Sequence, residues 1–337
     1  MINLDKKDSF SISVIRNVCM FLLVFGHILP FISKDLNSVL SFFTHPVRYT
    51  FFFVSGYLFS FADIKEPGKW FYNRWLRIGV PCYLFVLCDF LLCGIKNGFS
   101  VSHWDVLAYI FNFYGYIKIS VPGIATTHLW FITFILICYL FTPLLKKIRK
   151  EARIYVIFLL IIVQAVLCMT FPSYMNTYFI GYVVFAFAFF YGGKILDKKN
   201  LGKRSLFMVC LSALMIVLRL LCIFCLKESG FWDRFYNGIF VAYFDSIIGI
   251  TYMFLGFMWV SSCYEKLIKY KKGADYAAGL SYCIYLTHYF FCIGTFSVFA
   301  LSIPMWVKII SVAVLSYFSS LSVNYVSQLI IARFRKK

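Results

Sequence analysis

The chain has 337 residues, of which 62% are hydrophobic, 21% aromatic and only 14% charged. Soluble domains carry about 25% charged residues, so this composition and the positive mean hydropathy exclude an ordinary soluble protein and indicate a polytopic membrane protein. The formal net charge of +19 could suggest a nucleic-acid binder. The basic residues are instead spread in short clusters between apolar stretches, as the positive-inside rule requires, and we predict no nucleic-acid partner.

Apolar stretches of about 17–25 residues predict membrane-spanning helices, and the sequence contains ten of them. Their approximate limits are 12–31, 40–61, 78–95, 128–145, 154–171, 176–193, 205–226, 238–261, 280–300 and 304–326. The alternation of basic clusters places both termini on the cytoplasmic side. We predict an all-α integral membrane protein with about ten transmembrane helices, forming a single membrane domain over residues 1–337 with no separate soluble domain.

The longest predicted outer segment runs from Lys96 to Thr127 and contains an aromatic stretch from Trp104 to Phe111. We expect an interfacial or re-entrant helix there, because a further span would break the charge alternation. Most cysteines lie in apolar stretches, where cysteine behaves as a small hydrophobic residue. No run of residues has metal-ligand spacing, so we predict no metal site.

The first span carries two ionisable residues, Arg16 and His27. Their separation of eleven positions would place them within about 20° on one helical face and about 16 Å apart along the axis. Ionisable side chains in a span are costly and usually face a protein interior or a water-filled cavity. Two alternatives stay open, namely that Arg16 snorkels to the interface and that His27 is structural.

Two more arginines lie at the cytoplasmic start of the third span. Arg74 and Arg77 are three positions apart and so share a helical face. With Arg16 they predict a cationic inner group, and arginines bind phosphates through bidentate, charge-assisted hydrogen bonds. The alternative is that Arg74 and Arg77 only obey the positive-inside rule.

Histidines gather towards the outer side. His27 lies in the outer half of the first span, His45 and Arg48 at the outer end of the second, and His128 at the start of the fourth, whereas His288 is near the middle of the ninth. Histidine has the pKa range for a general base that acts on a hydroxyl group. The pattern favours an anion-binding inner mouth with a proton-transfer group above it, although His45 and His128 could equally be interfacial residues.

Three further charged residues lie inside predicted spans, and they are Asp89, Arg219 and Asp245. Charges within a membrane usually pair, so we expect these residues to pair with one another or with Arg48. The sequence does not assign the partners.

Five short motifs occur in order along nearly the whole chain. They are Arg16 to His27, with ten residues between the two, the aromatic stretch Phe51 to Leu58, Arg74 to Arg77, His128 to Phe131, and Ser281 to His288. Together they resemble the signature of the acyltransferase 3 family of integral membrane acyltransferases, and the closest resemblance is to its subgroup of sugar O-acetylases and related polysaccharide acyltransferases.

The resemblance implies an acyl-CoA co-substrate, usually acetyl-CoA, that enters from the cytoplasm, and a carbohydrate acceptor at the outer side, with no bound cofactor and no metal. Arg16, Arg74 and Arg77 would hold the CoA, and His27 would activate the acceptor hydroxyl. The residues expected on the acceptor side are His45, Arg48 and His128. The residues expected to support the site are Ser55, Gly56, Tyr285 and His288.

The sequence departs from the family pattern before Ser55. Where members usually carry Pro-Leu-Phe, this chain has Tyr49-Thr50-Phe51 preceded by Arg48, which could signal a different acceptor. The extracytoplasmic SGNH-type hydrolase domain of some members is absent from this sequence. The membrane part would then complete the acyl transfer or pass the acyl group to a partner.

The leading hypothesis is an O-acyltransferase that modifies a cell-surface polysaccharide or its lipid-linked sugar precursor in a bacterial inner membrane, in contact with membrane lipids. The alternative is a transporter or flippase for a polysaccharide precursor. Transporters often have two related halves, and no similarity between halves is visible. A third hypothesis is a non-catalytic membrane component of a larger complex.

Overall fold

The structure is a computed structural model that describes residues 4–99, 102–113, 124–170, 178–225, 232 and 234–335. Within these ranges the elements are α-helices and short 3-10 or π-helical turns, with no β-strand, which confirms the all-α class. The chain divides into two compact units. Unit 1 comprises Met1–Cys19, Phe42–Asp63 and Phe141–Asp275, and unit 2 comprises Met20–Ser41, Ile64–Leu140 and Tyr276–Lys337.

Both units combine segments that are far apart in the sequence. The long helices α1 (Lys6–Ile32) and α14 (Lys271–Cys292) each contribute residues to both units. Neither unit is a continuous stretch of chain that could be excised as it stands. The organisation of residues 1–337 as a single membrane domain stays a prediction.

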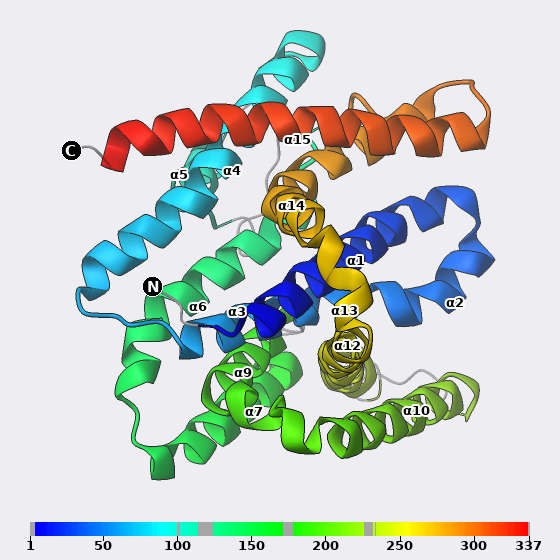
Figure 1. The fold of residues 1–337 in the computed structure, drawn as a ribbon. Helices are drawn as coiled ribbons and strands as arrows, with labels where there is room; N and C mark the ends of the chain where they lie inside the picture. Colours follow the sequence, from blue (N-terminus) through cyan, green and yellow to red (C-terminus); the bar gives the residue numbers. More distant parts are fainter. Residues whose placement is uncertain are drawn as a thin grey trace. The chain divides into compact units, whose positions relative to one another are not determined.

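Unit 1 is built around α3 (Val47–Ser60), which packs against α9 (Ile180–Ile195) and α12 (Val241–Ser262) (Figure 1). Helix α10 (Leu201–Cys225) packs on α12, and α7 (Arg153–Thr170) packs on α9. The short elements of this unit are η2 (Lys150–Ala152), η3 (Lys198–Asn200), the π-helix η4 (Arg234–Phe240), α13 (Tyr264–Leu267) and η5 (Ile268–Tyr270).

Glycines allow the helices of unit 1 to approach closely. A Cβ atom on Gly56 of α3 would collide with the backbone carbonyl oxygen of Phe185 on α9. A Cβ atom on Gly249 of α12 would lie 2.5 Å from the carbonyl oxygen of Pro46. Membrane helices gain stability mainly from such close packing and hydrogen bonding, because lipid tails are as apolar as their side chains.

Unit 2 contains two 31-residue helices, α4 (Pro67–Asn97) and α15 (Met305–Arg335), which pack against each other. Leu76 and Val80 of α4 form an apolar cluster with Ile331 of α15. The remaining elements of the unit are the larger part of α2 (Lys34–Thr44), α5 (His103–Phe111), η1 (Thr127–Leu129), the first part of α6 (Trp130–Lys147) and η6 (Val298–Ala300).

A helix is present where the aromatic stretch of the outer segment predicted one. Ser102 caps α5 by accepting from the backbone N–H of Asp105, and the Asp105 carboxylate accepts from the backbone N–H of Ser102. This capping box satisfies otherwise orphaned N–H groups. Residues 100–101 and 114–123 of the same segment lie outside the described residues, and the interfacial or re-entrant placement stays a prediction.

Seven described helices are long and apolar enough to cross a membrane. They lie at predicted spans one, three, four, five, seven, eight and ten. At the other three positions, α3 has 14 residues, α9 has 16 residues, and α14 ends at Cys292 rather than near residue 300. The chain is therefore a multi-pass membrane protein, while the count of ten and the cytoplasmic termini stay predictions.

The second predicted span requires a correction. The stretch 40–61 is not one helix, because a turn at His45 and Pro46 separates α2 from α3. Proline has no backbone N–H and its ring disfavours helical conformation in the residue before it, so Pro46 ends the first helix and starts the second.

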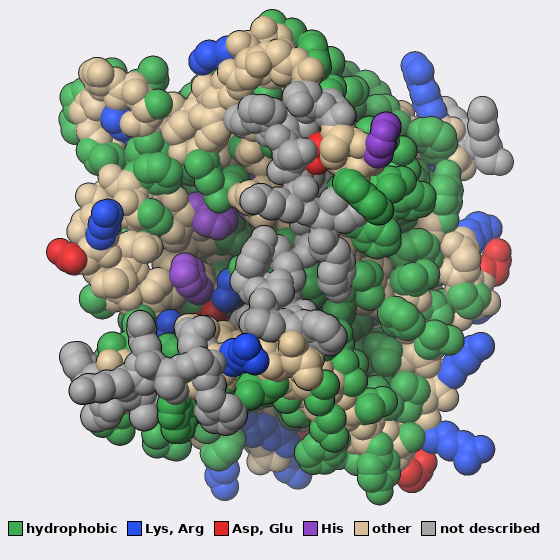
Figure 2. Space-filling view, turned by 180° about the vertical axis from the view of Figure 1, so that it is seen from behind, with side chains coloured by type: hydrophobic (Ala, Val, Ile, Leu, Met, Phe, Trp, Pro, Cys, Tyr) green, Lys and Arg blue, Asp and Glu red, His purple; other side chains and the backbone are tan. Residues whose placement is uncertain are grey.

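Large apolar side chains cover much of the face shown in Figure 2. Helix α10 also carries large exposed apolar side chains, since Leu206 and Phe207 are 66% and 65% exposed. In water such a surface would be unfavourable. It is the surface that lipid-facing helices need.

Candidate active site

Three of the five histidines lie together in unit 2. They are His27 of α1, His128 of η1 and His288 of α14. The rings of His27 and His288 stack with centroids 5.0 Å apart, and the ring of His128 lies 5.6 Å from that of His288. Tyr289 lies against His27 and His128, with its ring centroid 5.0 Å from that of His27 and 4.6 Å from that of His128. We call these four residues the histidine cluster.

The hydrogen bonds of His288 assign a tautomer to His27. The Nδ1 atom of His288 is 3.0 Å from the carbonyl oxygen of Ile284, one helical turn earlier. A carbonyl oxygen only accepts, so Nδ1 of neutral His288 carries the proton and its Nε2 accepts. His27 Nδ1 is 2.7 Å from that Nε2 and therefore donates to it. The lone pair of neutral His27 is then on Nε2, the nitrogen that can take a proton.

His128 is held by backbone groups of its neighbours. Its Nε2 lies 3.2 Å from the carbonyl oxygen of Leu286, to which it donates, and Tyr285 donates its hydroxyl to the His128 carbonyl oxygen. The Nδ1 atom of His128 is buried and has no hydrogen-bond partner in the described part of the chain. A buried acceptor of this kind is costly unless a donor reaches it, so a ligand hydroxyl group would find an acceptor here.

Two of the three arginines predicted to form a cationic inner group lie in unit 2, and a third arginine of that unit lies near them. Arg74 and Arg77 lie on α4, with the Arg74 guanidinium 5.6 Å from the Trp70 ring centroid. The positive charge of Arg335, in the last turn of α15, acts on both. This position follows from the packing of Ile331, one turn earlier, against α4. Three guanidinium groups can together bind a polyphosphate.

Arg16 belongs to unit 1 and is half-buried on α1. Its neighbours on that helix attach α1 to the beginning of α14. Asn17 donates to the carbonyl oxygen of Ala274 at 2.9 Å, and Ser13 donates to the Asp275 carboxylate at 2.6 Å. The continuous helix Lys6–Ile32 confirms that Arg16 and His27 share one helix.

The comparison with protein families decides the identity of the chain. The family model described as an acyltransferase domain matches residues 10–325, which is nearly the whole sequence. The chain belongs to the acyltransferase 3 family. No curated protein and no solved structure matched the chain in the corresponding searches.

This membrane acyltransferase thus carries the expected family motifs, and the structure places their residues. His27, His128, Tyr285 and His288 are brought together in unit 2. In unit 1, Ser55 is half-buried, and Gly56 permits the close approach of α3 to α9. The Ser-Gly motif of the acyltransferase therefore has a clear packing role at its glycine.

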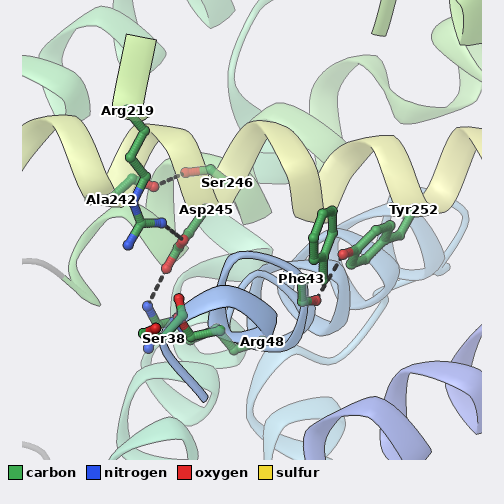
Figure 3. Close-up of polar contacts among 9 residues, drawn as sticks. Ser38, Phe43, Arg48, Arg219, Ala242, Asp245, Ser246 and Tyr252 are labelled. Atoms are coloured by element: carbon green, nitrogen blue, oxygen red, sulfur yellow. Dashed lines mark hydrogen bonds and ion pairs between the residues drawn. The ribbon is translucent and has the colours of Figure 1, made fainter. Parts of the chain in front are cut away.

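The charged residues whose partners the sequence left open are also placed. In unit 1, Asp245 of α12 lies between two arginines, 2.5 Å from Nη2 of Arg48 and 3.6 Å from Nη1 of Arg219 (Figure 3). His45 is exposed in the turn before α3. In unit 2, Asp89 accepts from the backbone N–H of Ala125 at 3.0 Å and from the Cys93 thiol at 3.2 Å.

Sequence reasoning missed two residues that the structure adds to these candidate groups. Tyr289 directly follows His288, and an aromatic residue in a Phe-rich span carries no signal of its own. Arg335 lies among four basic residues, with Arg333, Lys336 and Lys337, and such a cluster indicates only topology. Lys336 and Lys337 lie outside the described residues. The spacing of residues along α15 does not show that this helix packs against α4. The sequence alone therefore could not place Arg335 near Arg74 and Arg77.

Proposed function

We propose that this acyltransferase moves an acyl group, expected to be acetyl, from cytoplasmic acyl-CoA to a hydroxyl group of a cell-surface polysaccharide or lipid-linked sugar precursor, in a bacterial inner membrane. The observation that carries the proposal is the His27–His288 hydrogen bond of 2.7 Å. It supports a fixed imidazole with a lone pair on Nε2, which a general base for a hydroxyl needs.

In the proposed reaction His27 Nε2 takes the proton of the acceptor hydroxyl while the hydroxyl oxygen attacks the thioester carbonyl carbon. The carbon–sulfur bond breaks, and the CoA thiolate leaves and recovers the proton from His27. The products are the O-acyl ester and CoA. No covalent acyl-enzyme is required in this scheme, and His288 keeps the base in the productive tautomer.

The acyl-CoA and the acceptor would bind to different side chains of the protein. Arg74, Arg77 and Arg335 of unit 2 would hold the phosphates of the acyl-CoA, and a role for Arg16 stays a prediction from the sequence. The buried Nδ1 of His128 would accept a hydrogen bond from a hydroxyl group of the acceptor. A sugar carries several neighbouring hydroxyl groups, so one could meet His128 while another reacts at His27.

The experiment compares the purified protein with its His27→Gln variant, using radiolabelled acetyl-CoA and membranes that contain the cell's glycans. We expect label transfer by the wild-type protein and a loss of about 10²–10⁴-fold in the variant, the usual contribution of a general base. The matched control is His103→Gln, because His103 is an exposed histidine on α5.

Mass spectrometry of surface glycans from cells with and without the gene would name the acceptor class. A difference of one acyl group is the expected result. Glycans of unchanged mass, together with no transfer from acetyl-CoA in vitro, would overturn the proposal and favour the transporter hypothesis. Full activity of His27→Gln would overturn the assignment of the base alone.

A further inference from the structure

Arg219 is a cation in the most apolar of the candidate spans. The helical segment Lys198–Ile223 is the most apolar of the seven candidate spans, and Arg219 lies near the C-terminal end of this segment. A charge inside a membrane segment is expensive and is usually paired or functional. Its surroundings in unit 1 therefore bear on what the protein binds.

Among the described residues, the charges around Arg219 do not balance. Asp245 faces both Arg48 and Arg219, at 2.5 Å and 3.6 Å, and it is the only carboxylate within ion-pair distance of either arginine in the described part of the chain. Two positive charges and one negative charge leave one positive charge in the group. An uncompensated charge away from water is unfavourable, which predicts a second anion.

Aromatic rings cover the faces of both guanidinium groups. Arg219 lies 4.1 Å from the Phe42 ring centroid and 4.4 Å from that of Phe244. Arg48 lies 5.1 Å and 5.0 Å from the ring centroids of Tyr49 and Tyr178. Cation–π contacts offset part of the charge, but they leave the N–H groups, which point outward in the guanidinium plane, still to be satisfied.

Several of these N–H groups have no acceptor among the described residues. The Nε atoms of Arg48 and Arg219 are buried and make no hydrogen bond to any described residue. The two side chains are nevertheless 19% and 13% exposed, so the group is not fully sealed from the surface. Arginine N–H groups match the oxygens of a phosphate or carboxylate.

The start of α3 adds positive potential at the same place. Arg48 is the second residue of α3, and no side chain caps the helix at Pro46. A helix N-terminus carries partial positive charge and favours anions over cations. The partial charge of the helix end therefore adds to the positive charge of Arg48 and Arg219, beyond what Asp245 offsets.

We propose that Arg48 and Arg219, oriented by Asp245, form a binding site for one phosphate-type oxyanion, such as a phosphodiester. This site uses other residues than the proposed donor arginines and does not depend on the acyl-transfer proposal. The phosphodiester could belong to a membrane phospholipid or to a soluble or acceptor-borne phosphate, because the same N–H groups recognise each.

The test measures anion binding by the purified full-length protein in nonionic detergent. The probes are phosphatidylglycerol and inorganic phosphate, and the readouts are native mass spectrometry and the shift of the melting temperature. In Arg219→Gln the Arg48–Asp245 pair remains and the excess charge is gone, so binding should weaken at least about ten-fold. In Asp245→Asn both arginines are unpaired, so the stabilisation by anions should exceed that of the wild-type protein.

An oxyanion site predicts weaker anion binding in Arg219→Gln and stronger anion binding in Asp245→Asn. A purely structural ion pair predicts no such opposite changes in anion binding. Arg149→Gln is the matched control, because Arg149 is an exposed arginine in a turn of the same unit. A response to the lipid alone would support a phospholipid ligand, and a response to both probes would support a site open to other phosphates. Equal anion responses in the wild-type, Arg219→Gln and Asp245→Asn proteins would overturn the proposal.

Discussion

Nε2 of His288 lies 2.7 Å from Nδ1 of His27, although the two residues are 261 positions apart. His288 is fully buried, and its other ring nitrogen is engaged by the carbonyl oxygen of Ile284. The backbone of α14 thus determines which nitrogen of His27 holds the lone pair. In the proposed reaction His27 is the catalytic residue and His288 is a positioning residue.

Replacing His288 should reduce the turnover number and leave substrate binding unchanged. In His288→Leu, His27 loses the acceptor for its Nδ1–H, and we expect kcat to fall about 10²-fold, within the range of general-base effects. His288→Gln carries an amide oxygen that can accept from His27, so it should retain clearly more activity than His288→Leu. Steady-state kinetics of both variants, at matched protein levels, test this order.

The kinetics separate positioning from a general loss of structure. KM for acyl-CoA and the melting temperature in detergent should stay near the wild-type values in both variants. If Gln and Leu reduce kcat equally, the tautomer argument is wrong. If KM rises as much as kcat falls, His288 acts on binding instead.

Arg335 should contribute to binding of the acyl-CoA. Its charge acts on Arg74 and Arg77, and removing one charge-assisted phosphate contact in a solvent-accessible place costs about 1 kcal/mol. We expect Arg335→Gln to raise KM for acyl-CoA about five-fold with little change in kcat, which is the pattern of uniform binding. The effect should shrink at high salt because of screening.

Arg333→Gln is the matched control for Arg335. The two residues share the exposed last turn of α15, but two positions correspond to about 200° around a helix. Arg333 therefore faces away from the side that carries Arg335. Equal KM values for the two variants would mean that the net positive charge of the terminus, rather than a contact, attracts the donor.

The sequence predicted helix positions well because apolar length is a local property. It located Arg16, His27, Arg74 and Arg77 on helices at the expected places. It did not predict the turn at Pro46 as a break in the second span, although proline is itself a local signal. Because apolar residues lie on both sides of Pro46, the stretch resembles one uninterrupted span.

The contacts of the candidate site could not be predicted from the sequence. The pairing of Asp245 with Arg48 and Arg219 joins three helices of unit 1. Which helices meet depends on side-chain shape at their contacts, which spacing along one helix does not encode. For the same reason Gly56 was expected only to support the site, whereas the structure specifies the contact with Phe185 that excludes a larger residue.

Gly56→Ala should destabilise the protein. The added methyl group would overlap the Phe185 carbonyl oxygen, a backbone atom that can move only with α9. Overpacking of this kind costs about 1–3 kcal/mol. We expect a lower melting temperature in detergent and less protein in the membrane.

Gly279→Ala provides the contrast to Gly56→Ala. Gly279 lies within α14, and a Cβ atom there would meet nothing within 4 Å. Alanine is the better helix former by up to about 1 kcal/mol, so this variant should be as stable as the wild-type protein or more stable. Similar losses in both variants would mean that glycine flexibility, and not close packing, matters at Gly56.

Asp275 predicts a pH dependence of stability. It lies at the start of α14, before the apolar part of that helix, and accepts from Lys271 Nζ at 2.5 Å and Ser13 Oγ at 2.6 Å. Burial raises the pKa of this carboxyl group, but the hydrogen bonds from Lys271 and Ser13 outweigh burial and hold the pKa below its ordinary value.

A lowered pKa in the folded protein means that the folded state binds the proton less readily than the unfolded state. The stabilisation is complete above the unfolded pKa of about 3.9 and is lost as the pH falls through the lower folded value. We therefore expect the melting temperature of Asp275→Asn to lie below that of the wild-type protein at pH 6 and to converge with it towards pH 3. The difference should be small, because the Asp275 side chain is 41% exposed and solvent screens its charge.

Ser13→Ala removes one of the two donors to Asp275 and should give an intermediate difference in melting temperature at pH 6. A difference between the wild-type protein and Asp275→Asn that does not change between pH 6 and pH 3 would show that the carboxylate's charge contributes nothing to joining α1 to α14.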